Sequence, residues 1–401
     1  MKKRVGIIGG GIIGCSLAYY LTHYEGIEPY VIEKDQLGSG TTSKSAGTVS
    51  LLDDSIPEDL FDVRILALRT YIGMENESKG SAGFNDIGTL AICPFTDYGR
   101  QSLEFVQKAV EMSKKNGFTA GFFDNGNALK KVVPDLNVEG VAGGGYSIGD
   151  GWFNATGIAT TFGEKAKSRS ATILTRTKAT RVLMTGNRVT GLETTKGTFD
   201  FDVVVNAAGP WAHEVGRMVS QELPVMHTKA NVFILKPRSP LGYDLPMLKH
   251  PRFYTKTEGP KRVFACRAHL TMDLGQAQDA GFFEPDNLPL AGGTDPSALD
   301  YLASQLANSI PRLTESSVVS DYLAYRMESR DYLPILGESG IHGYILAVGL
   351  GGNGVIFAPA VAQDLSKYIA TGEKGELLRK FEFTREGRFR MSFHSDAVVG
   401  E

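Results

Sequence analysis

The first forty residues alternate between apolar runs and glycines in a pattern that predicts a strand, a helix and a second strand. The run 4–8 is short, apolar and rich in β-branched residues, as expected of a buried strand. Leu17, Ala18 and Leu21 then recur at helical spacing, and the run 30–33 predicts the next strand. The chain therefore opens with a βαβ unit, which is typical of open α/β sheets.

Helical or strand-like periodicity recurs through most of the remaining chain. It predicts helices over 100–115, over 154–167 and after Pro296, and strands over 182–184, 188–193, 201–205, 232–235 and 262–266. Asn154 is placed to cap the second of these helices. Residues 344–369 repeat the order strand, glycine loop, helix. Because this order occurs at both ends of the chain, we expect one domain to be assembled from distant segments, with the middle inserted.

Composition narrows the class of protein. Of 401 residues 42% are hydrophobic and 22% charged, as in ordinary globular proteins. The net charge of -3 argues against a nucleic-acid binder. Cys15, Cys93 and Cys266 are scattered and the histidines show no HxH or HExxH spacing, so we predict neither a disulfide framework nor a metal site. A reducing, cytoplasmic location is expected.

The N-terminus resembles a signal peptide but is interpreted as folded structure. Lys2, Lys3 and Arg4 precede an apolar run over 5–18, as in a secretory leader. However, five glycines interrupt the run and no small-x-small cleavage pattern follows it. No stretch of 18 apolar residues is free of Gly, Asn or charge, so a transmembrane segment is not expected, whereas peripheral membrane contact stays open.

Residues 9–14, the first glycine turn, predict a dinucleotide site. Gly9, Gly11 and Gly14 satisfy GxGxxG directly after a predicted strand and at the start of a predicted helix. The glycines allow a tight turn, close approach of a diphosphate and close packing of helix on strand, and the helix N-terminus attracts the anion. Glu33 follows Gly14 by 19 residues, where a carboxylate binds ribose hydroxyls. This motif does not distinguish NAD from FAD.

Two later segments favour FAD. The block 203–211 (VVVNAAGPW) and residues 349–354, the second glycine loop, exceed what a plain NAD domain requires. A second glycine-lined helix N-terminus could face a second anion, such as a reduced flavin ring. Taken alone, the second glycine loop is equally consistent with a tight connection between a strand and a helix.

Five blocks together resemble the D-amino-acid oxidase superfamily of FAD-dependent oxidoreductases, which includes glycine oxidase, sarcosine oxidase and dimethylglycine dehydrogenase-like flavoproteins. In chain order they are GGGIIG with Glu33, SGTTSKSAG, VVNAAGPWA, RMESRDYLPILG and GLGGNGVIFAPAVAQ. The resemblance implies a mixed α/β (α+β) fold in which a Rossmann-like FAD-binding domain is interleaved with a mixed-sheet substrate domain. We assign residues 1–85, 141–223 and 325–380 to the first domain, 86–140 and 224–324 to the second, and 381–401 to a C-terminal tail.

The resemblance also implies which residues contact FAD. Val182 is expected on the adenine side, and the second glycine loop at the pyrimidine end of the flavin. The full set is Gly9, Gly11, Ile12, Ile13, Gly14, Glu33, Lys34, Thr42, Ser43, Ser45, Ala46, Gly47, Val182, Ala207, Ala208, Gly209, Trp211, Gly351, Gly352, Asn353, Gly354 and Val355. Relatives with covalent FAD attach it through a histidine or a cysteine at positions that are Lys44 and Ala324 here, so we predict non-covalent FAD.

The substrate site is expected at the start of the late block. By the same resemblance, Arg326 would hold a substrate carboxylate through its planar fork, unless it pairs with Glu328 or Asp331 instead. Tyr254 and His269 are further candidates, with a core tyrosine and a structural histidine as the alternatives. Residues 327–330 depart from the proline-containing pattern of relatives, which changes the local shape expected of this site.

We therefore predict an oxidase or dehydrogenase that moves hydride from the α-carbon or N-alkyl carbon of a small amino acid or amine to flavin N5. The imine product would hydrolyse. Expected partners are a small carboxylate-bearing amine and, as electron acceptor, oxygen or a quinone- or dye-like compound; a homo-oligomer is left open. The chain ends 47 residues beyond Gly354, so a folate-coupled demethylase is not expected.

Three alternatives stay open at this point. A FAD-dependent dehydrogenase of 2-hydroxyacids or glycerol 3-phosphate would use the same anion-binding arginine. A plain NAD-dependent dehydrogenase would use only the first glycine turn. A non-catalytic flavoprotein subunit of a larger complex would bind FAD without turning over a substrate.

Overall fold

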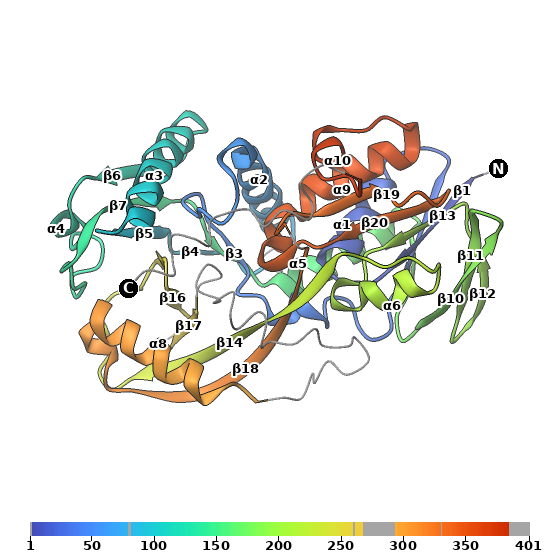
Figure 1. Ribbon diagram of the computed structural model, residues 1–401. Helices are drawn as coiled ribbons and strands as arrows, with labels where there is room; N and C mark the ends of the chain where they lie inside the picture. Colours follow the sequence, from blue (N-terminus) through green and yellow to red (C-terminus); the bar gives the residue numbers. More distant parts are fainter. Residues whose placement is uncertain (1, 79–81, 260, 268–292, 330, 385–401) are drawn as a thin grey trace.

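Two large β-sheets lie side by side in the computed structural model, which describes residues 2–78, 82–259, 261–267, 293–329 and 331–384 (Figure 1). A six-stranded, mostly parallel sheet carries the two ends of the chain, and an eight-stranded mixed sheet carries its middle. Two three-stranded sheets complete the described strands. This is the mixed α/β fold that the sequence predicts.

The six-stranded sheet brings together segments more than 300 residues apart. Its order is β19 (Ile335–Glu338), β20 (Tyr344–Val348), β13 (Val203–Asn206), β1 (Lys3–Ile8), β2 (Ile27–Ile32) and β9 (Thr172–Leu174), with only β19 antiparallel to its neighbour. Ile7 pairs with Val31 on one side and Val205 on the other, and all three are fully buried. Apolar residues on both faces are the reason these short strands occupy the interior.

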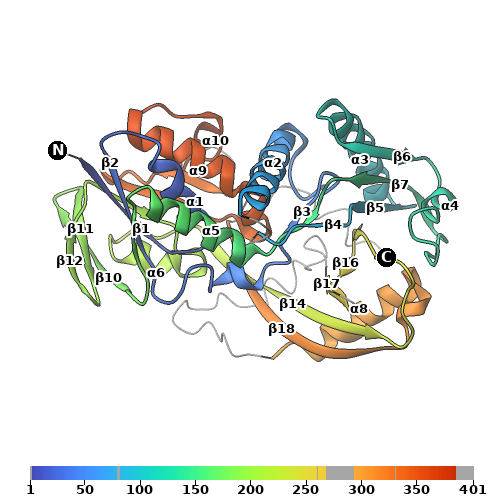
Figure 2. The same ribbon diagram turned by 180° about the vertical axis from the view of Figure 1, so that it is seen from behind.

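Helices from the two ends and from the middle of the chain cover one face of this sheet. They are α1 (Ile12–Leu21), α5 (Ala155–Ser168) and α9 (Gly354–Thr371), with α2 (Phe61–Ser78) packed beside α9 (Figure 2). Asn154 caps α5 as predicted, because its side chain accepts a hydrogen bond from Gly157 N at 3.0 Å. Ile158 and Phe162 of the same helix are fully buried. The sequence did not predict α2.

The eight-stranded sheet presents one face to the first sheet. Its order is β18 (Ser316–Ser329), β14 (Val225–Pro237), β17 (Val263–Arg267), β16 (Phe253–Thr257), β15 (Met247–His250), β5 (Thr89–Pro94), β7 (Val141–Ile148) and β6 (Thr119–Phe123). Helix α3 (Asp97–Lys115) packs on β5, β6 and β7, and α8 (Pro296–Ser309) contacts β14 and β17. Strand β7 thus pairs with strands of the predicted substrate domain, whereas the sequence-based division assigns 141–223 to the FAD-binding domain; this division stays a prediction.

The remaining elements are short. The strands predicted over 182–184 and 188–193 form a hairpin of β10 (Ala179–Thr185) and β11 (Arg188–Thr194), which β12 (Gly197–Asp200) extends. The others are β3 (Thr48–Val49), β8 (Gly151–Trp152), β4 (Asn85–Asp86), α4 (Gly126–Leu129), α6 (Ala212–Arg217), α10 (Glu376–Lys380) and the 3-10 turns η1 (Thr41–Lys44), η2 (Glu58–Leu60), η3 (Gly209–Trp211), η6 (Pro311–Leu313) and η7 (Gly351–Asn353). None of the helices in the described part of the chain combines the length and hydrophobicity that crossing a membrane requires.

A buried carboxyl group lies where the strand β8 approaches the eight-stranded sheet. Asp150 Oδ2 accepts hydrogen bonds from Leu51 N at 2.8 Å, Thr89 Oγ1 at 3.0 Å and Ser147 Oγ at 2.7 Å. Its Oδ1 has no partner among the described residues. Burial outweighs the three hydrogen bonds and raises the pKa of Asp150 to about 6.

This shift predicts a pH-dependent stability. The folded chain binds the Asp150 proton more tightly than the unfolded chain does. The contribution of Asp150 to the free energy of unfolding therefore falls between about pH 4 and pH 6, and it stays low above pH 6. A shift of this size corresponds to about 3 kcal/mol. We expect Asp150→Asn, which retains the neutral form, to be more stable than the unmodified chain at pH 8 but not at pH 4. Parallel stability curves, measured by chemical denaturation, would contradict this.

Candidate functional site

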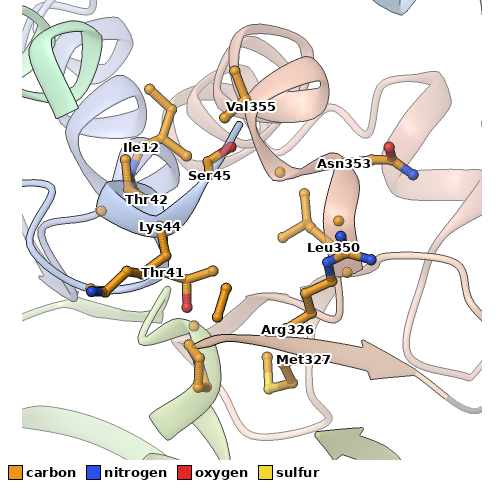
Figure 3. Close-up of a pocket in the computed structure, with 18 of the residues that line it drawn as sticks. Ile12, Thr41, Thr42, Lys44, Ser45, Arg326, Met327, Leu350, Asn353 and Val355 are labelled. Atoms are coloured by element: carbon orange, nitrogen blue, oxygen red, sulfur yellow. Dashed lines mark hydrogen bonds between the residues drawn. The ribbon is translucent and has the colours of Figure 1, made fainter. Parts of the chain in front are cut away.

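One large cavity lies between the two sheets. Its walls come from the carboxyl ends of β1, β2, β13 and β20, from residues 39–42, 44–46 and 48, and from one face of the eight-stranded sheet. Figure 3 shows Thr41, Thr42 and Lys44 on one side of this space, with Arg326, Leu350 and Asn353 on the other. The cavity therefore occupies the crevice at the carboxyl ends of parallel strands, where open α/β sheets bind their ligands.

Most of the predicted cofactor residues line this cavity. They are Gly9, Gly11, Ile12, Ile13, Glu33, Lys34, Thr42, Ser45, Ala46, Ala207, Ala208, Gly209, Trp211, Gly351, Gly352, Asn353, Gly354 and Val355. The predicted substrate residues Arg326 and Tyr254 line it as well. His269 lies outside the described residues. Contact of any of these residues with FAD or a substrate stays a prediction.

Four predicted cofactor residues lie off the cavity wall that the described residues form. Gly14 packs against Gly9, and Ser43 donates to Gly40 O at 2.9 Å within its own turn. Gly47 packs against the carbonyl of Phe153, and Val182 is buried in a core cluster. Ala179, the first residue of β10, and the preceding Thr177 and Lys178 reach the cavity instead.

The first glycine turn has the geometry of a diphosphate cradle. Gly9 adopts a φ of 111°, and a Cβ there would lie 2.4 Å from Ala207 O. A Cβ on Gly14 would lie 1.9 Å from Gly9 O, so only glycine allows α1 to begin this close to the turn. Ile12 N donates to Thr42 Oγ1 at 3.1 Å. Within the described residues, the rest of the helix N-terminus carries no side-chain cap from Gly11 and no acidic residue that would exclude an anion.

Glu33 is held in place by the turn that it faces. Its Oε2 accepts from Gly10 N at 2.6 Å and its Oε1 from Asp35 N at 2.8 Å. Next to it, Lys34 Nζ lies 3.4 Å from the centroid of the Trp211 ring, a close cation–π contact. Burial lowers the pKa of Lys34. This end of the cavity therefore combines a fixed carboxylate, an ammonium and an aromatic ring.

The second glycine loop forms a facing wall. Gly351 has a φ of 53°, and a Cβ there would lie 2.2 Å from Glu328 Oε2. A Cβ on Gly352 would lie 3.4 Å from the guanidinium carbon of Arg326. Helix α9 follows with no acidic residue in its first turn and no side-chain cap from Asn353, as far as the described residues show. Two helix N-termini without acidic residues, from segments more than 300 positions apart, therefore border one cavity.

Arg326 and Tyr254 meet on the face of the eight-stranded sheet that lines the cavity. Arg326 Nη2 donates to Tyr254 Oη at 3.5 Å, a long hydrogen bond. Burial alone would lower the pKa of Arg326, but the nearby Tyr254, Cys266 and Glu328 raise it, so the guanidinium stays charged. The alternative of an ion pair with Glu328 or Asp331 is not seen among the described residues. The guanidinium is free to bind an anion in the cavity.

The sequence did not point to two further polar residues of this wall. Lys249 Nζ forms an ion pair with Asp53 Oδ2 at 2.5 Å and lies 5.1 Å from the centroid of the Tyr254 ring. Despite its burial, the pKa of Asp53 is lowered, chiefly by Lys249. His250 Nδ1 accepts from Arg252 N at 3.2 Å, and burial lowers the pKa of His250 to about 4. Lys249 and His250 are neighbours on β15 and Asp53 lies in a loop 196 residues away, so no spacing pattern in the sequence links them to a site.

Comparison with known proteins gives consistent matches over the whole chain. Residues 4–368 match the family model of the FAD dependent oxidoreductases. The chain is 24% identical to human mitochondrial dimethylglycine dehydrogenase over 98% of its own length but only 46% of the length of that protein. It is 25% identical to glycine oxidase from Geobacillus kaustophilus, with 96% of this chain and 97% of that protein covered.

Two solved structures have a similar fold, and one of them is of the glycine oxidase named above. The crystal structure of L-proline dehydrogenase from P. horikoshii superposes with a TM-score of 0.77 at 22% identity, covering 98% of this chain and 99% of that one. That of glycine oxidase from Geobacillus kaustophilus gives a TM-score of 0.74. The family match spans both glycine-rich walls of the cavity. The chain therefore belongs to the family of FAD dependent oxidoreductases.

Proposed function

We propose that the chain oxidises the C–N bond of a small amino acid or N-alkylated amino acid that carries a carboxylate. The observation that carries this proposal is Arg326, a half-buried and charged guanidinium on the cavity wall beside the second glycine loop. Relatives named dimethylglycine dehydrogenase and glycine oxidase support an amine or amino-acid substrate. An anion-binding arginine beside a flavin site is what such a substrate requires.

The residues present fit FAD at both ends. The backbone N–H groups at the start of α1 would hold the diphosphate, and Glu33 would bind ribose hydroxyls. The start of α9 would face the negative charge that a reduced flavin ring carries. FAD, when bound, supplies the hydride acceptor for the reaction.

The protein's own contribution is to orient the substrate. Arg326 would bind the carboxylate through its two parallel N–H groups, and Tyr254 would limit where the rest of the molecule lies. No side chain has to remove a proton from carbon in this reaction, because a neutral amine transfers its hydride directly. Met327 and Leu350 add apolar surface that excludes water from the reacting centre.

Anaerobic reduction of the bound flavin tests the proposal. Glycine, sarcosine, proline, D-amino acids and dimethylglycine are compared with 2-hydroxyglutarate and glycerol 3-phosphate, and released ammonia or formaldehyde is measured. Bleaching by an amine, with ammonia or formaldehyde as product, is the expected result. Bleaching by the hydroxy compounds alone would show that the C–O bond is the target. Reoxidation by oxygen and by an artificial dye then identifies the class of acceptor.

The cofactor should be held without a covalent bond. The loop position at which covalently flavinylated relatives carry histidine is Lys44, which lines the cavity, and Ala324 stands at the cysteine position. Neither the ammonium group of Lys44 nor the methyl group of Ala324 can replace the histidine or cysteine that forms the covalent bond in those relatives. Acid precipitation of the yellow protein should therefore leave all of the chromophore in the supernatant. Flavin that stays in the washed pellet would disprove this.

A further inference from the structure

We infer that Asp54 determines substrate specificity, by selecting molecules with a cationic, hydrogen-bond-donating group at the opposite end from their carboxylate. The inference rests on the proposed function, because it takes Arg326 as the site of the carboxylate. It adds the chemical class of the substrate's other end: amino acids whose side chain or N-substituent ends in an ammonium or similar cation, rather than in a hydrocarbon.

The argument starts from one face of the eight-stranded sheet. Cross-strand pairing places Lys249 opposite Tyr254, Tyr254 opposite Cys266, and Cys266 opposite Val232. Side chains at directly paired positions point to the same face. Arg326 follows on this face, four residues along β18 from Tyr322, the partner of Val232. Tyr254 therefore stands between Arg326 on one side and Lys249 on the other, and all three line the cavity.

The loop 52–55 closes the cavity beyond Lys249. Asp53 is 5% exposed and forms an ion pair with Lys249, and Ser55 N donates to Asp53 Oδ1 at 3.0 Å. Ser55 Oγ also donates to Asn353 Oδ1 at 3.3 Å, which joins this loop to the second glycine loop. The position of the neighbouring Asp54 is thus fixed from both walls of the cavity.

Asp54 is the carboxylate on this wall that no cation neutralises by direct contact. Its Oδ2 accepts from Tyr98 Oη at 2.7 Å and from Ser102 Oγ at 2.6 Å, both neutral hydroxyl donors. Among the described residues the ion pairs do not include Asp54, although it lines the cavity together with Ser102, Ala91 and Ile92. Its second oxygen can accept a hydrogen bond from a ligand.

The other charged groups near Asp54 are already engaged. Lys249 is paired with Asp53, and His250 is neutral because burial lowers its pKa. Arg64 lies behind the loop, fully buried and off the cavity wall, where its Nη2 donates to Asp53 O at 2.5 Å and Ile56 O at 2.6 Å. Arg64 reduces the negative potential of Asp54 but cannot contact a ligand. On this face of the eight-stranded sheet and its adjoining loop, the described residues therefore offer a ligand the guanidinium of Arg326 and the carboxylate of Asp54, which forms no ion pair.

Matched ligands that lack a reacting α-amine test this directly on the flavin-loaded protein. We compare 4-aminobutanoate with pentanoate, 5-aminopentanoate with hexanoate, and 6-aminohexanoate with heptanoate, by calorimetry and by perturbation of the flavin spectrum. Each pair differs only by an ammonium in place of a methyl group. For at least one chain length the amino acid should bind about 10-fold tighter than its partner, as expected when a buried charge pair replaces an unpaired carboxylate.

Two variants complete the test. Asp54→Asn should reduce that preference to below about 2-fold, while Asp135→Asn should leave it unchanged. Asp135 is a matched control because it also accepts a hydrogen bond from a tyrosine, Tyr243, at 3.2 Å but does not line the cavity. Equal binding within every pair, or a preference that survives in Asp54→Asn, overturns the inference and leaves Arg326 as the anchor. Failure of all six ligands to bind, in a protein whose flavin is still reduced by an amine, overturns the inference but not the proposed function.

Discussion

Replacing Gly14 with alanine is expected to weaken FAD binding by at least about 100-fold, equivalent to about 3 kcal/mol. The new Cβ would lie 1.9 Å from Gly9 O, which is far inside ordinary contact. Since Gly9 O belongs to the backbone of the first glycine turn, the clash can be relieved only by moving α1 away from that turn. The N–H groups that would bind the diphosphate move with it.

Gly73→Ala provides the control for this prediction. Gly73 lies inside α2, and a Cβ there would meet no atom within 4 Å. Alanine at an open helical position stabilises a helix by about 1 kcal/mol, so this variant should bind FAD normally. FAD affinity is measured by titrating the apoprotein while circular dichroism reports the fold. A folded Gly14→Ala protein with normal FAD affinity would show that the first glycine turn does not hold the diphosphate.

Arg326→Ala should weaken binding of a carboxylate substrate by about 10- to 150-fold. The variant loses a charge-assisted hydrogen bond to the carboxylate, worth about 1.5–3 kcal/mol. Because the guanidinium lies against Gly352 rather than within a packed core, its removal should leave the fold and FAD binding intact. The measurement is the substrate concentration that half-reduces the flavin under anaerobic conditions.

Arg326→Lys separates charge from geometry at the same position. Lysine retains the positive charge but lacks the planar pair of donors, so it should recover only part of the lost affinity. Substrate binding that is normal in Arg326→Ala would exclude Arg326 as the anchor. Full recovery by lysine would show that charge alone, without the bidentate fork, holds the substrate.

The elements that the sequence predicts well are those whose local signal and tertiary role agree. The opening βαβ unit, the cap at Asn154 and the strand over 344–348 all appear as expected, because apolar spacing and glycine positions there reflect burial directly. The glycine-rich turns of both cavity walls could be predicted from the sequence for the same reason. Only glycine can occupy a turn such as that at Gly9, where φ is positive and a neighbouring carbonyl lies close.

The sequence does not predict the elements and contacts that depend on tertiary packing rather than on a local pattern. Helix α2 has apolar residues around much of its circumference and holds a fully buried Arg64, so it lacks a clear amphipathic stripe. The first half of β18 is an exposed edge without apolar alternation. Lys249 and Asp53 are 196 residues apart and meet only because the loop 52–55 folds against β15. No spacing rule predicts such a contact.

Equilibrium titration of the apoprotein with FAD, FMN and NAD tests the central claim most directly. The claim is that two glycine-rich walls from opposite ends of the chain bind one FAD. The first glycine turn binds the diphosphate, and the second glycine loop binds the flavin ring. We predict one FAD per chain and a stable yellow complex. FMN, which lacks the adenylate half, and NAD, which lacks the flavin ring, should each bind at least about 100-fold more weakly. A protein that stays colourless with excess FAD, or that binds NAD as tightly, would contradict the account.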